Sequence, residues 1–238
     1  MAKTEGSRKS GVAWKIRHAI AVFVGLFRRP GRFSLIHYPR KAAERFLENT
    51  GKNGIVLNIG SGGRRAADFT VEVDLEAHSN VDVAADANHL PFRNESCDGI
   101  WMLSLLEHVE KPHVVVREAR RVLKRGGWLY VEIPFICGFH PAPGDYLRWS
   151  PQGLPLLFEG WKVEWLEPTS GPFSALAYHL RACLSIMTSF GSELVYRVIF
   201  EAIWGYVVWP LKWLDFCFKG HPRSLGHAFG FAIMVRKE

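Results

Sequence analysis

The sequence predicts an α/β fold in which a mostly parallel sheet carries helices on its faces. Three observations support this prediction. Short runs rich in β-branched residues recur between residues 51 and 168, polar or glycine-rich turns separate these runs, and the connector at 112–124 is helical in pattern. The length of 238 residues fits one such domain with additional segments at its ends.

The expected strands follow one another at regular intervals. They cover residues 55–59, 70–74, 81–86, 98–103 and 128–133, and a last apolar run at 227–235 is expected to form one more strand. A helix is predicted over 112–124, because Pro112 suits a first helical turn and Gly126 and Gly127 follow its basic end.

The net charge of +7 is concentrated at the N-terminus. Residues 1–50 contain 11 Lys and Arg against 3 acidic residues, whereas the remainder contains 19 against 20. The body of the chain is therefore close to neutral. Because phosphate contacts require cations on a folded surface, we expect no nucleic-acid partner.

Residues 1–50 form a basic amphipathic N-terminal segment. Between residues 12 and 29, apolar side chains such as Trp14, Ile20 and Phe27 recur at helical spacing, with Lys15 and Arg17 among them. The apolar part is shorter than the ~20 residues that span a bilayer. This helix either lies on an anionic membrane surface or packs on the body of the protein.

Residues 169–238 differ in composition from the preceding part. Eight aromatic residues lie within 193–218, and Pro210 is expected to kink or split a helix there. Only ten residues separate Glu201 from Lys212, which argues against a single membrane span. The segment is typical of helices at a membrane surface, and a lid that buries its aromatics against the sheet is equally compatible.

The four cysteines do not indicate a metal site. Cys97, Cys137, Cys183 and Cys217 are too far apart for a CxxC pair, and no histidine stands at zinc-finger spacing from them, so no metal is expected. Free thiols without a secretory cleavage pattern favour the cytoplasm, with peripheral attachment to the inner face of the plasma membrane if the terminal segments bind lipid.

A glycine-rich turn follows the first predicted strand. Arg65 stands where a dinucleotide fingerprint requires a small residue, which disfavours NAD. Asp74 ends the second strand, where a carboxylate can accept both ribose hydroxyls, and Asp86 ends the third, from which it could accept an adenine amino proton. The glycine turn and these two acids, in this order, fit an adenosyl group carried without pyrophosphate.

Six motifs in order resemble the class I S-adenosylmethionine-dependent methyltransferases. They are residues 57–63, 73–75, 85–92, 97–98, 106–109 and 121–127. More narrowly, the chain is similar to a small bacterial branch found with surface-polysaccharide and lipid-linked sugar pathways. The resemblance covers 54–168 and implies a Rossmann-like methyltransferase sheet with an antiparallel last strand, a cofactor-binding core at 51–168, and a helical insertion plus final strand at 169–238.

The resemblance also implies which residues bind S-adenosyl-L-methionine. They are Asn58, Gly60, Ser61 and Gly62 at the methionine end, Asp74 and Leu75 at the ribose, Asp86 and Ala87 at the adenine, and Leu103, Ser104 and Leu105 beneath the sulfonium. The chain departs from the family pattern at Asn58, where most members carry an acid. In addition, only 14 residues lead from Gly60 to Asp74, so the usual helix there must be very short or lost.

Two regions offer a proton acceptor for a methyl acceptor that must lose a proton. His108 follows the fourth strand, and the loop after the fifth carries His140 and Asp145. Tyr146 and Arg148 on the same loop would contact the methyl acceptor. Alternatively, Asp145 and Arg148 pair to hold the loop, and Glu107 with His108 only caps or packs a helix.

The leading hypothesis is an O-methyltransferase that acts on a lipid-linked sugar or another hydrophobic acceptor at the membrane. A protein that binds the cofactor but has lost turnover is the first alternative. A methyltransferase acting on a quinone or isoprenoid precursor, or on nucleic acid, is the second. The oligomeric state does not follow from the sequence.

Overall fold

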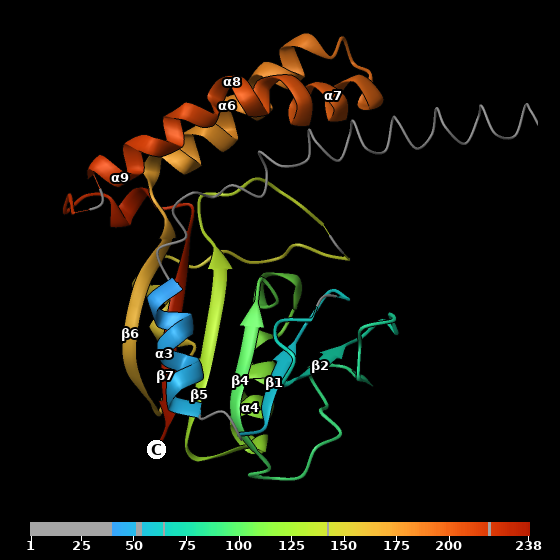
Figure 1. The fold of residues 1–238 in the computed structure, drawn as a ribbon, viewed down its shortest axis with the longest axis vertical. Helices are drawn as coiled ribbons and strands as arrows, with labels where there is room; N and C mark the ends of the chain where they lie inside the picture. Colours follow the sequence, from blue (N-terminus) through green and yellow to red (C-terminus); the bar gives the residue numbers. More distant parts are fainter. Residues whose placement is uncertain (1–39, 51–53, 64, 142, 219) are drawn as a thin grey trace, which may run out of the picture.

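The computed structural model describes residues 40–50, 54–63, 65–141, 143–218 and 220–238 (Figure 1). Within them, seven strands form one sheet in the order β3-β2-β1-β4-β5-β7-β6. The strands are β1 (Val56–Ile59), β2 (Thr70–Asp74), β3 (Val83–Ala84), β4 (Cys97–Leu103), β5 (Leu123–Pro134), β6 (Trp161–Ser170) and β7 (Gly230–Lys237).

The sheet is parallel except at one strand. β1 to β5 pair in parallel, whereas β7 lies between β5 and β6 and is antiparallel to both. This arrangement confirms the predicted Rossmann-like methyltransferase sheet with an antiparallel last strand. The carboxyl ends of the parallel strands meet at one edge, where open α/β sheets bind ligands.

Helices cover both faces of the sheet (Figure 1). On one face α4 (Pro112–Val122) buries Val115, Ala119 and Val122 in the main core. On the opposite face α3 (Arg40–Thr50) buries Phe46 against Tyr130. Part of the basic segment 1–50 therefore packs on the body, and the predicted membrane-binding stretch 12–29 lies outside the described residues.

Several expected boundaries are wrong. The last strand is predicted over 227–235 but lies at Gly230–Lys237, and the strand predicted over 128–133 is β5, which begins at Leu123. The helix predicted over 112–124 ends at Val122, because Leu123 is extended and pairs with Cys97 at the start of β5. A bulge between this pair and the next one contains Gly126, whose φ is +75°. The strand predicted over 81–86 is reduced to the two residues of β3.

The connections between strands are short near the glycine turn. Residues 60–63 and 65–69 join β1 to β2 without a described helix, as the short spacing predicts. After β4 the chain forms the 3-10 turn η1 (Leu106–His108), and after β5 a long loop leads to α5 (Gly153–Leu156). The carboxyl edge is therefore formed largely by loops.

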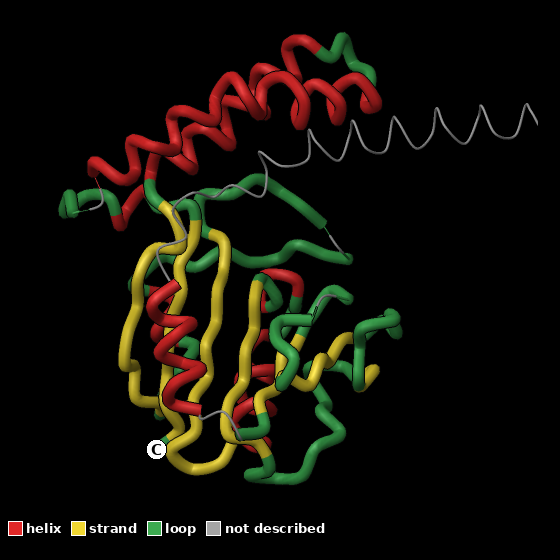
Figure 2. Tube along the Cα trace, in the orientation of Figure 1, coloured by secondary structure: helices red, strands yellow, loops and turns green. Residues whose placement is uncertain are grey.

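A layer of helices crosses the carboxyl edge of the sheet (Figure 2). α6 (Pro172–Thr188) follows β6 directly and lies beside a second helical run. This run consists of α7 (Glu193–Ile199), the π-helix η2 (Phe200–Trp204), α8 (Gly205–Val208), the 3-10 segment η3 (Trp209–Trp213) and α9 (Leu214–Phe218), before the turn η4 (Leu225–His227). We call α6 to α9 the helical layer.

Contacts along its whole length hold the second run against α6. The guanidinium of Arg181 lies 3.7 Å from the centroid of the Phe200 ring, and Trp204 donates to Thr188 at 2.9 Å. Asp215, which is fully buried, accepts from the backbone amides of Phe173 and Ser174 at 2.8 and 2.9 Å. The carboxylate of α9 thus satisfies amides that the first turn of α6 leaves unpaired.

The helical layer exposes much apolar surface. Of the 23 exposed large hydrophobic side chains in the described residues, 15 lie between Leu176 and Phe218. None of the eight aromatic residues of 193–218 is fully buried, so a lid that hides its aromatics against the sheet does not describe this layer. Among the described residues, the helical run Glu193–Phe218 is long and apolar enough to cross a membrane by length and composition alone.

Candidate active site

The glycine turn after β1 packs tightly against its neighbours. The backbone amides of Gly60 and Ser61 both donate to the Val73 carbonyl, at 2.8 and 3.2 Å. Gly60 has φ +75°, and a Cβ there would lie 2.8 Å from Cδ1 of Leu105. Glycine is therefore required at this position for its conformation and for the close approach of the segment after β4.

Asp74 at the end of β2 is held by this turn. Its Oδ2 accepts from the Gly62 amide at 2.7 Å, and its Oδ1 accepts from the Glu76 amide at 3.1 Å. Each carboxylate oxygen retains acceptor capacity for a ribose hydroxyl. Leu75 beside it is 68% exposed, as a residue that covers a bound group from one side would be.

The presence of asparagine at position 58 is explained by Glu72, a buried neighbour that is not among the predicted site residues. Its Nδ2 donates to Oε2 of Glu72 at 2.6 Å, and Glu72 is fully buried on β2 opposite Asn58. An acid at position 58 would place two buried carboxylates in contact and raise the pKa of one of them. The signal for Glu72 is an acidic residue in the middle of a β-branched strand.

Two buried polar atoms near the turn have no hydrogen-bond partner among the described residues. They are Oδ1 of Asn58 and Oγ of Ser61. A Cβ added at Gly62 would meet no atom of the described residues within 4 Å, so these residues leave the space above the turn open. An ammonium group can donate to Asn58 Oδ1, and a hydroxyl can donate or accept, so these residues fit the amino-acid end of S-adenosylmethionine.

The residues predicted near the adenine form a turn after β3. Oδ1 of Asp86 accepts from the Asn88 amide at 2.8 Å, and this hydrogen bond holds the pKa of the carboxyl below its usual range. Asp86 is half-exposed and its second oxygen faces His89 at 3.9 Å. Ala87 packs on the main core.

The three residues predicted beneath the sulfonium do not lie on one face of the sheet. Leu105 packs against Gly60, and Ser104 adopts φ +53°, an uncommon conformation for a residue other than glycine, while its amide donates to the Glu132 carbonyl at 2.9 Å. Leu103 packs on the opposite face, against the core beneath α3. Leu103 is therefore a core residue, because alternate side chains of a strand point to opposite faces.

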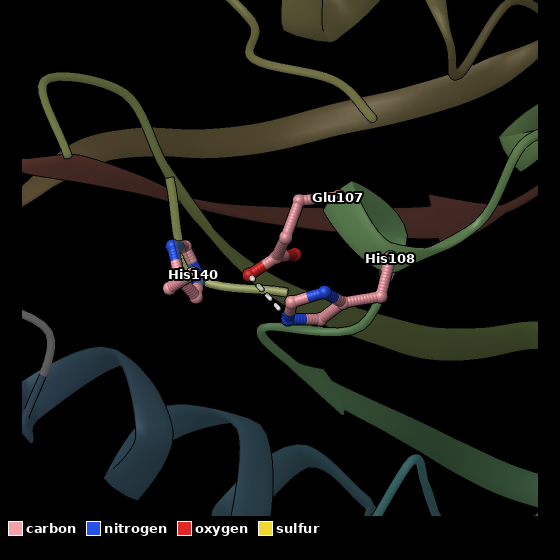
Figure 3. A group of neighbouring side chains, drawn as sticks. All are labelled: Glu107, His108 and His140. Atoms are coloured by element: carbon pink, nitrogen blue, oxygen red, sulfur yellow. Dashed lines mark ion pairs between the residues drawn. The ribbon is translucent and has the colours of Figure 1, made fainter. Parts of the chain in front are cut away.

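Glu107, His108 and His140 come together although they belong to two loops (Figure 3). One potential ligand atom from each lies within 4.8 Å of the others. Glu107 is fully buried, and burial raises the pKa of its carboxyl. Nε2 of His108 lies 3.8 Å from Oε1 of Glu107, and the Tyr146 amide donates to the Glu107 carbonyl at 2.7 Å.

Asp145 holds the loop together, which corrects its expected role as proton acceptor. Both of its oxygens accept from Arg148, and Oδ2 also accepts from the His140 amide at 2.9 Å. The side chain is 1% exposed, and the Arg148 guanidinium lowers the pKa of the carboxyl. A carboxylate so stabilised is a weak base. Both terminal nitrogens of Arg148 donate to this carboxylate, so Arg148 also serves to hold the loop. Tyr146 is exposed.

A cavity of about 340 Å³ lies between the carboxyl edge of the sheet and the helical layer. Its polar lining includes Ser104, Glu132, Ser170, Tyr178, Arg181 and Lys212. Of these, only Ser104 is among the predicted site residues. Local sequence does not indicate Tyr178, Arg181 and Lys212, because only the folding of α6 and η3 over the sheet brings them there.

The region that contains the glycine turn is similar to known methyltransferase sequences. A family model described as "Methyltransferase domain" matches residues 45–131. Over 109 residues, 43% of this chain and 37% of the relative, the sequence is 33% identical to the ubiquinone/menaquinone biosynthesis C-methyltransferase UbiE of Rhizobium meliloti (strain 1021). The matched segments span less than half the length of the curated relatives.

Solved structures share the fold at low sequence identity. The 1,6-didemethyltoxoflavin-N1-methyltransferase of Burkholderia thailandensis, with its substrate and S-adenosylhomocysteine bound, has a TM-score of 0.52 at 13% identity, covering 94% of this chain and 89% of its own. Coclaurine N-methyltransferase bound to N-methylheliamine and S-adenosylhomocysteine has a TM-score of 0.50 at 14% identity, covering 83% and 70%. Residues 45–131 therefore match a methyltransferase domain, and the sheet that contains them has a fold shared with solved methyltransferase structures.

Proposed function

We propose that the protein is an S-adenosylmethionine-dependent methyltransferase. The observation that carries this proposal is the arrangement at the ends of β1 and β2. The glycine turn is hydrogen-bonded to Asp74, beside two buried polar atoms, Asn58 Oδ1 and Ser61 Oγ, that have no hydrogen-bond partner in the described part of the chain. These groups match the ribose and the amino-acid end of the cofactor, and residues 45–131 match a methyltransferase domain.

The chain contributes mainly by positioning. When bound, the cofactor supplies a methyl group on a sulfonium, which is a good leaving group. The Gly60 turn and Leu105 would hold the cofactor at the carboxyl edge, and the cavity beneath α6 would hold the acceptor in line with the methyl carbon. Such orientation supplies most of the rate enhancement in a displacement of this kind.

The acceptor that fits best is a hydrophobic molecule methylated on oxygen. Arg181, Lys212 and Glu132 give the cavity charged groups of both signs, and Ile133, Val208 and Phe229 give it apolar walls. The helical layer above exposes 15 large hydrophobic side chains to the outside. A lipid-linked sugar at the cytoplasmic face of the membrane combines these properties, and would place the protein in the branch associated with surface polysaccharides.

A second candidate is a quinone or other isoprenoid precursor. The relative at 33% identity is named for ubiquinone and menaquinone biosynthesis, and the same cavity and apolar layer suit a prenylated ring. A protein that binds the cofactor but has lost turnover is less favoured. The hydrogen bond between Asn58 and Glu72 gives a structural reason for an asparagine where most members of the family carry an acid. Nucleic acid is least favoured, since the chain beyond residue 50 has 19 basic against 20 acidic residues.

Calorimetric titration with S-adenosylhomocysteine tests cofactor binding. We expect Asp74→Ala to weaken affinity by about 10- to 100-fold, since a hydrogen bond to a charged group contributes about 1.5–3 kcal/mol. Glu76→Ala is the matched control, because the Glu76 side chain is 75% exposed and only its amide contacts Asp74. An unmodified chain that fails to bind at millimolar concentration would refute the proposal.

Incubation with labelled S-adenosylmethionine and bacterial membranes tests the acceptor. We expect the label in the lipid extract, bound through an ether that survives mild alkali. Release of the lipid-linked sugar by mild acid would separate a sugar acceptor from a quinone, because the label would leave with the sugar in the first case only. Label confined to the aqueous phase would contradict a hydrophobic acceptor.

A further inference from the structure

We propose that Glu107, His108 and His140 bind a divalent first-row transition metal, with Zn²⁺ as the ion that fits best. Their potential ligand atoms lie within 4.8 Å of one another, and Figure 3 shows the three side chains converging from η1 and from the loop after β5. Two imidazoles and one carboxylate are a ligand set found in catalytic zinc sites that keep a fourth position open.

The carboxylate of Glu107 provides the strongest evidence. Glu107 is fully buried, and neither of its side-chain oxygens has a hydrogen-bond partner among the described residues. The nearest recorded nitrogen, Nε2 of His108, lies 3.8 Å from Oε1, beyond hydrogen-bond distance. Burying such a group is unfavourable unless a cation accompanies it.

Both imidazoles are oriented as metal ligands usually are. Nδ1 of His108 contacts the Gly144 carbonyl, and Nδ1 of His140 lies 2.8 Å from the Gly138 carbonyl. A carbonyl can only accept, so each Nδ1 is placed to donate, and in the neutral form of such a ring the Nε2 lone pair is available to a metal ion. Backbone carbonyls hold metal-binding histidines in this way in other sites, and fix the tautomer.

The charge around the cluster is compatible with a cation. Arg148 lies 3.4 Å from Nδ1 of His140, but its charge is balanced by Asp145, to which both of its terminal nitrogens donate. The formal charge that remains is that of Glu107. Zinc with bonds of about 2.1 Å holds tetrahedral ligands about 3.4 Å apart, so metal binding requires the ligand atoms to move closer together by up to about 1.4 Å.

The position of the cluster gives the ion a role that rests on the proposed function. Gly138 precedes His140 by two residues, and a Cβ there would lie 3.2 Å from Cε1 of Tyr178, which lines the cavity. A metal ion at the open side would contact an acceptor hydroxyl and lower its pKa. The hydroxyl proton passes to water, the oxygen bonds to the methyl carbon, and the carbon–sulfur bond breaks with its electron pair left on sulfur.

Titration of the chelator-treated full-length protein with Co²⁺ tests the site directly. We expect one equivalent to bind with the intense visible absorption of four-coordinate cobalt, and Zn²⁺ to displace it. Glu107→Gln and His140→Ala should each weaken binding at least 100-fold. His113→Ala is the matched control, because His113 is an exposed histidine on α4, and it should bind as the unmodified chain does.

Thermal unfolding separates loss of metal binding from loss of the fold. Without metal, Glu107→Gln should melt at or above the temperature of the unmodified chain, because the amide removes a buried unpaired charge. Zn²⁺ should raise the melting temperature of the unmodified chain and leave that of Glu107→Gln unchanged. Equal Zn²⁺ affinity in the unmodified chain and both variants, or no binding by any of them, would overturn the proposal.

Titration with S-adenosylhomocysteine on the same samples keeps the two proposals distinct. Metal binding without cofactor binding would refute the proposed function and leave the metal site standing. Cofactor binding without metal binding would refute the metal site alone.

Discussion

At the scale of single residues, Gly60 gives the sharpest test of the turn after β1. Its φ is +75° and its Cβ position lies 2.8 Å from Cδ1 of Leu105. We expect Gly60→Ala to lower the free energy of unfolding by about 2–4 kcal/mol, because it adds overpacking to the strain of a left-handed conformation. Urea unfolding measures this loss, and cofactor affinity should fall with it.

Gly62 is the matched control for Gly60. Its φ is +59°, but no atom lies within 4 Å of its Cβ position. Gly62→Ala should therefore lose only the conformational part, about 1 kcal/mol. Adding Leu105→Ala to Gly60→Ala should remove part of the steric penalty. Equal losses in the Gly60 and Gly62 variants would show that the approach of Leu105 does not matter.

The residues that the sequence predicts well are those whose role depends on local chain geometry. Gly60 and Asp74 follow from strands that end where a turn begins. Asn58 and Asp145 do not, because their partners are determined by tertiary contacts: Glu72 across the β1–β2 register and Arg148 within a folded loop. The sequence singles out Glu107, but only the structure shows that its buried side-chain oxygens have no hydrogen-bond partner among the described residues.

At the scale of elements, Asp215 joins α9 to the beginning of α6. It is fully buried and accepts from two amides of the first turn of α6. We expect Asp215→Ala to reduce the free energy of unfolding by about 2–3 kcal/mol, because it removes the acceptor of buried amides. Hydrogen exchange should show the amides of Phe173 and Ser174 losing protection first.

A substitution in α7 controls for general weakening of the helical layer. Glu193 pairs with Arg197 at 2.7 Å, and both side chains are more than two-thirds exposed. Glu193→Ala should change stability by less than about 0.5 kcal/mol and leave exchange at α6 unaltered. Increased exchange spread evenly over the sheet in Asp215→Ala would instead indicate global destabilisation.

Element prediction succeeded where hydrophobic periodicity was unbroken. β2 was predicted with the observed bounds, and α4 with its observed first residue, Pro112. The start of β5 was missed because Leu123 pairs with Cys97 across a bulge, which no local pattern reveals. Pro210 is expected to interrupt the helical run, and it lies in the first turn of a 3-10 segment, since it cannot donate the hydrogen bond of a regular helix.

At the scale of the whole molecule, apolar surface and charge are both distributed unevenly. The helical layer carries 15 of the 23 exposed large hydrophobic side chains in the described part of the chain. Residues 1–50 carry 11 of the 30 Lys and Arg. A bilayer surface with anionic lipid would cover the first feature and attract the second. The contact of Asp215 with α6 and the contact of Arg181 of α6 with Phe200 favour a helical run lying along the membrane over one that crosses it.

Vesicle sedimentation tests this orientation. The full chain should sediment with vesicles containing phosphatidylglycerol, and replacing Val198, Val207 and Phe216 together by Ser should weaken binding on the order of 100-fold, if each side chain contributes about 1 kcal/mol. These three side chains are 55%, 59% and 74% exposed, so the folded protein should tolerate the change.

The control for this experiment replaces equally exposed apolar residues on other parts of the surface. Phe69 lies in the turn before β2 and is 43% exposed, and Leu156 lies at the end of α5 and is 78% exposed. Replacing both by Ser should leave sedimentation unchanged. Raising the salt concentration should weaken binding of the full chain and the triple variant by the same factor, because it screens the basic segment and not the apolar contact. Equal sedimentation of the triple variant and the unmodified chain at all salt concentrations would exclude the helical layer as the membrane-binding surface. Its exposed apolar side chains would then have to be explained by a protein partner or a second copy of the chain.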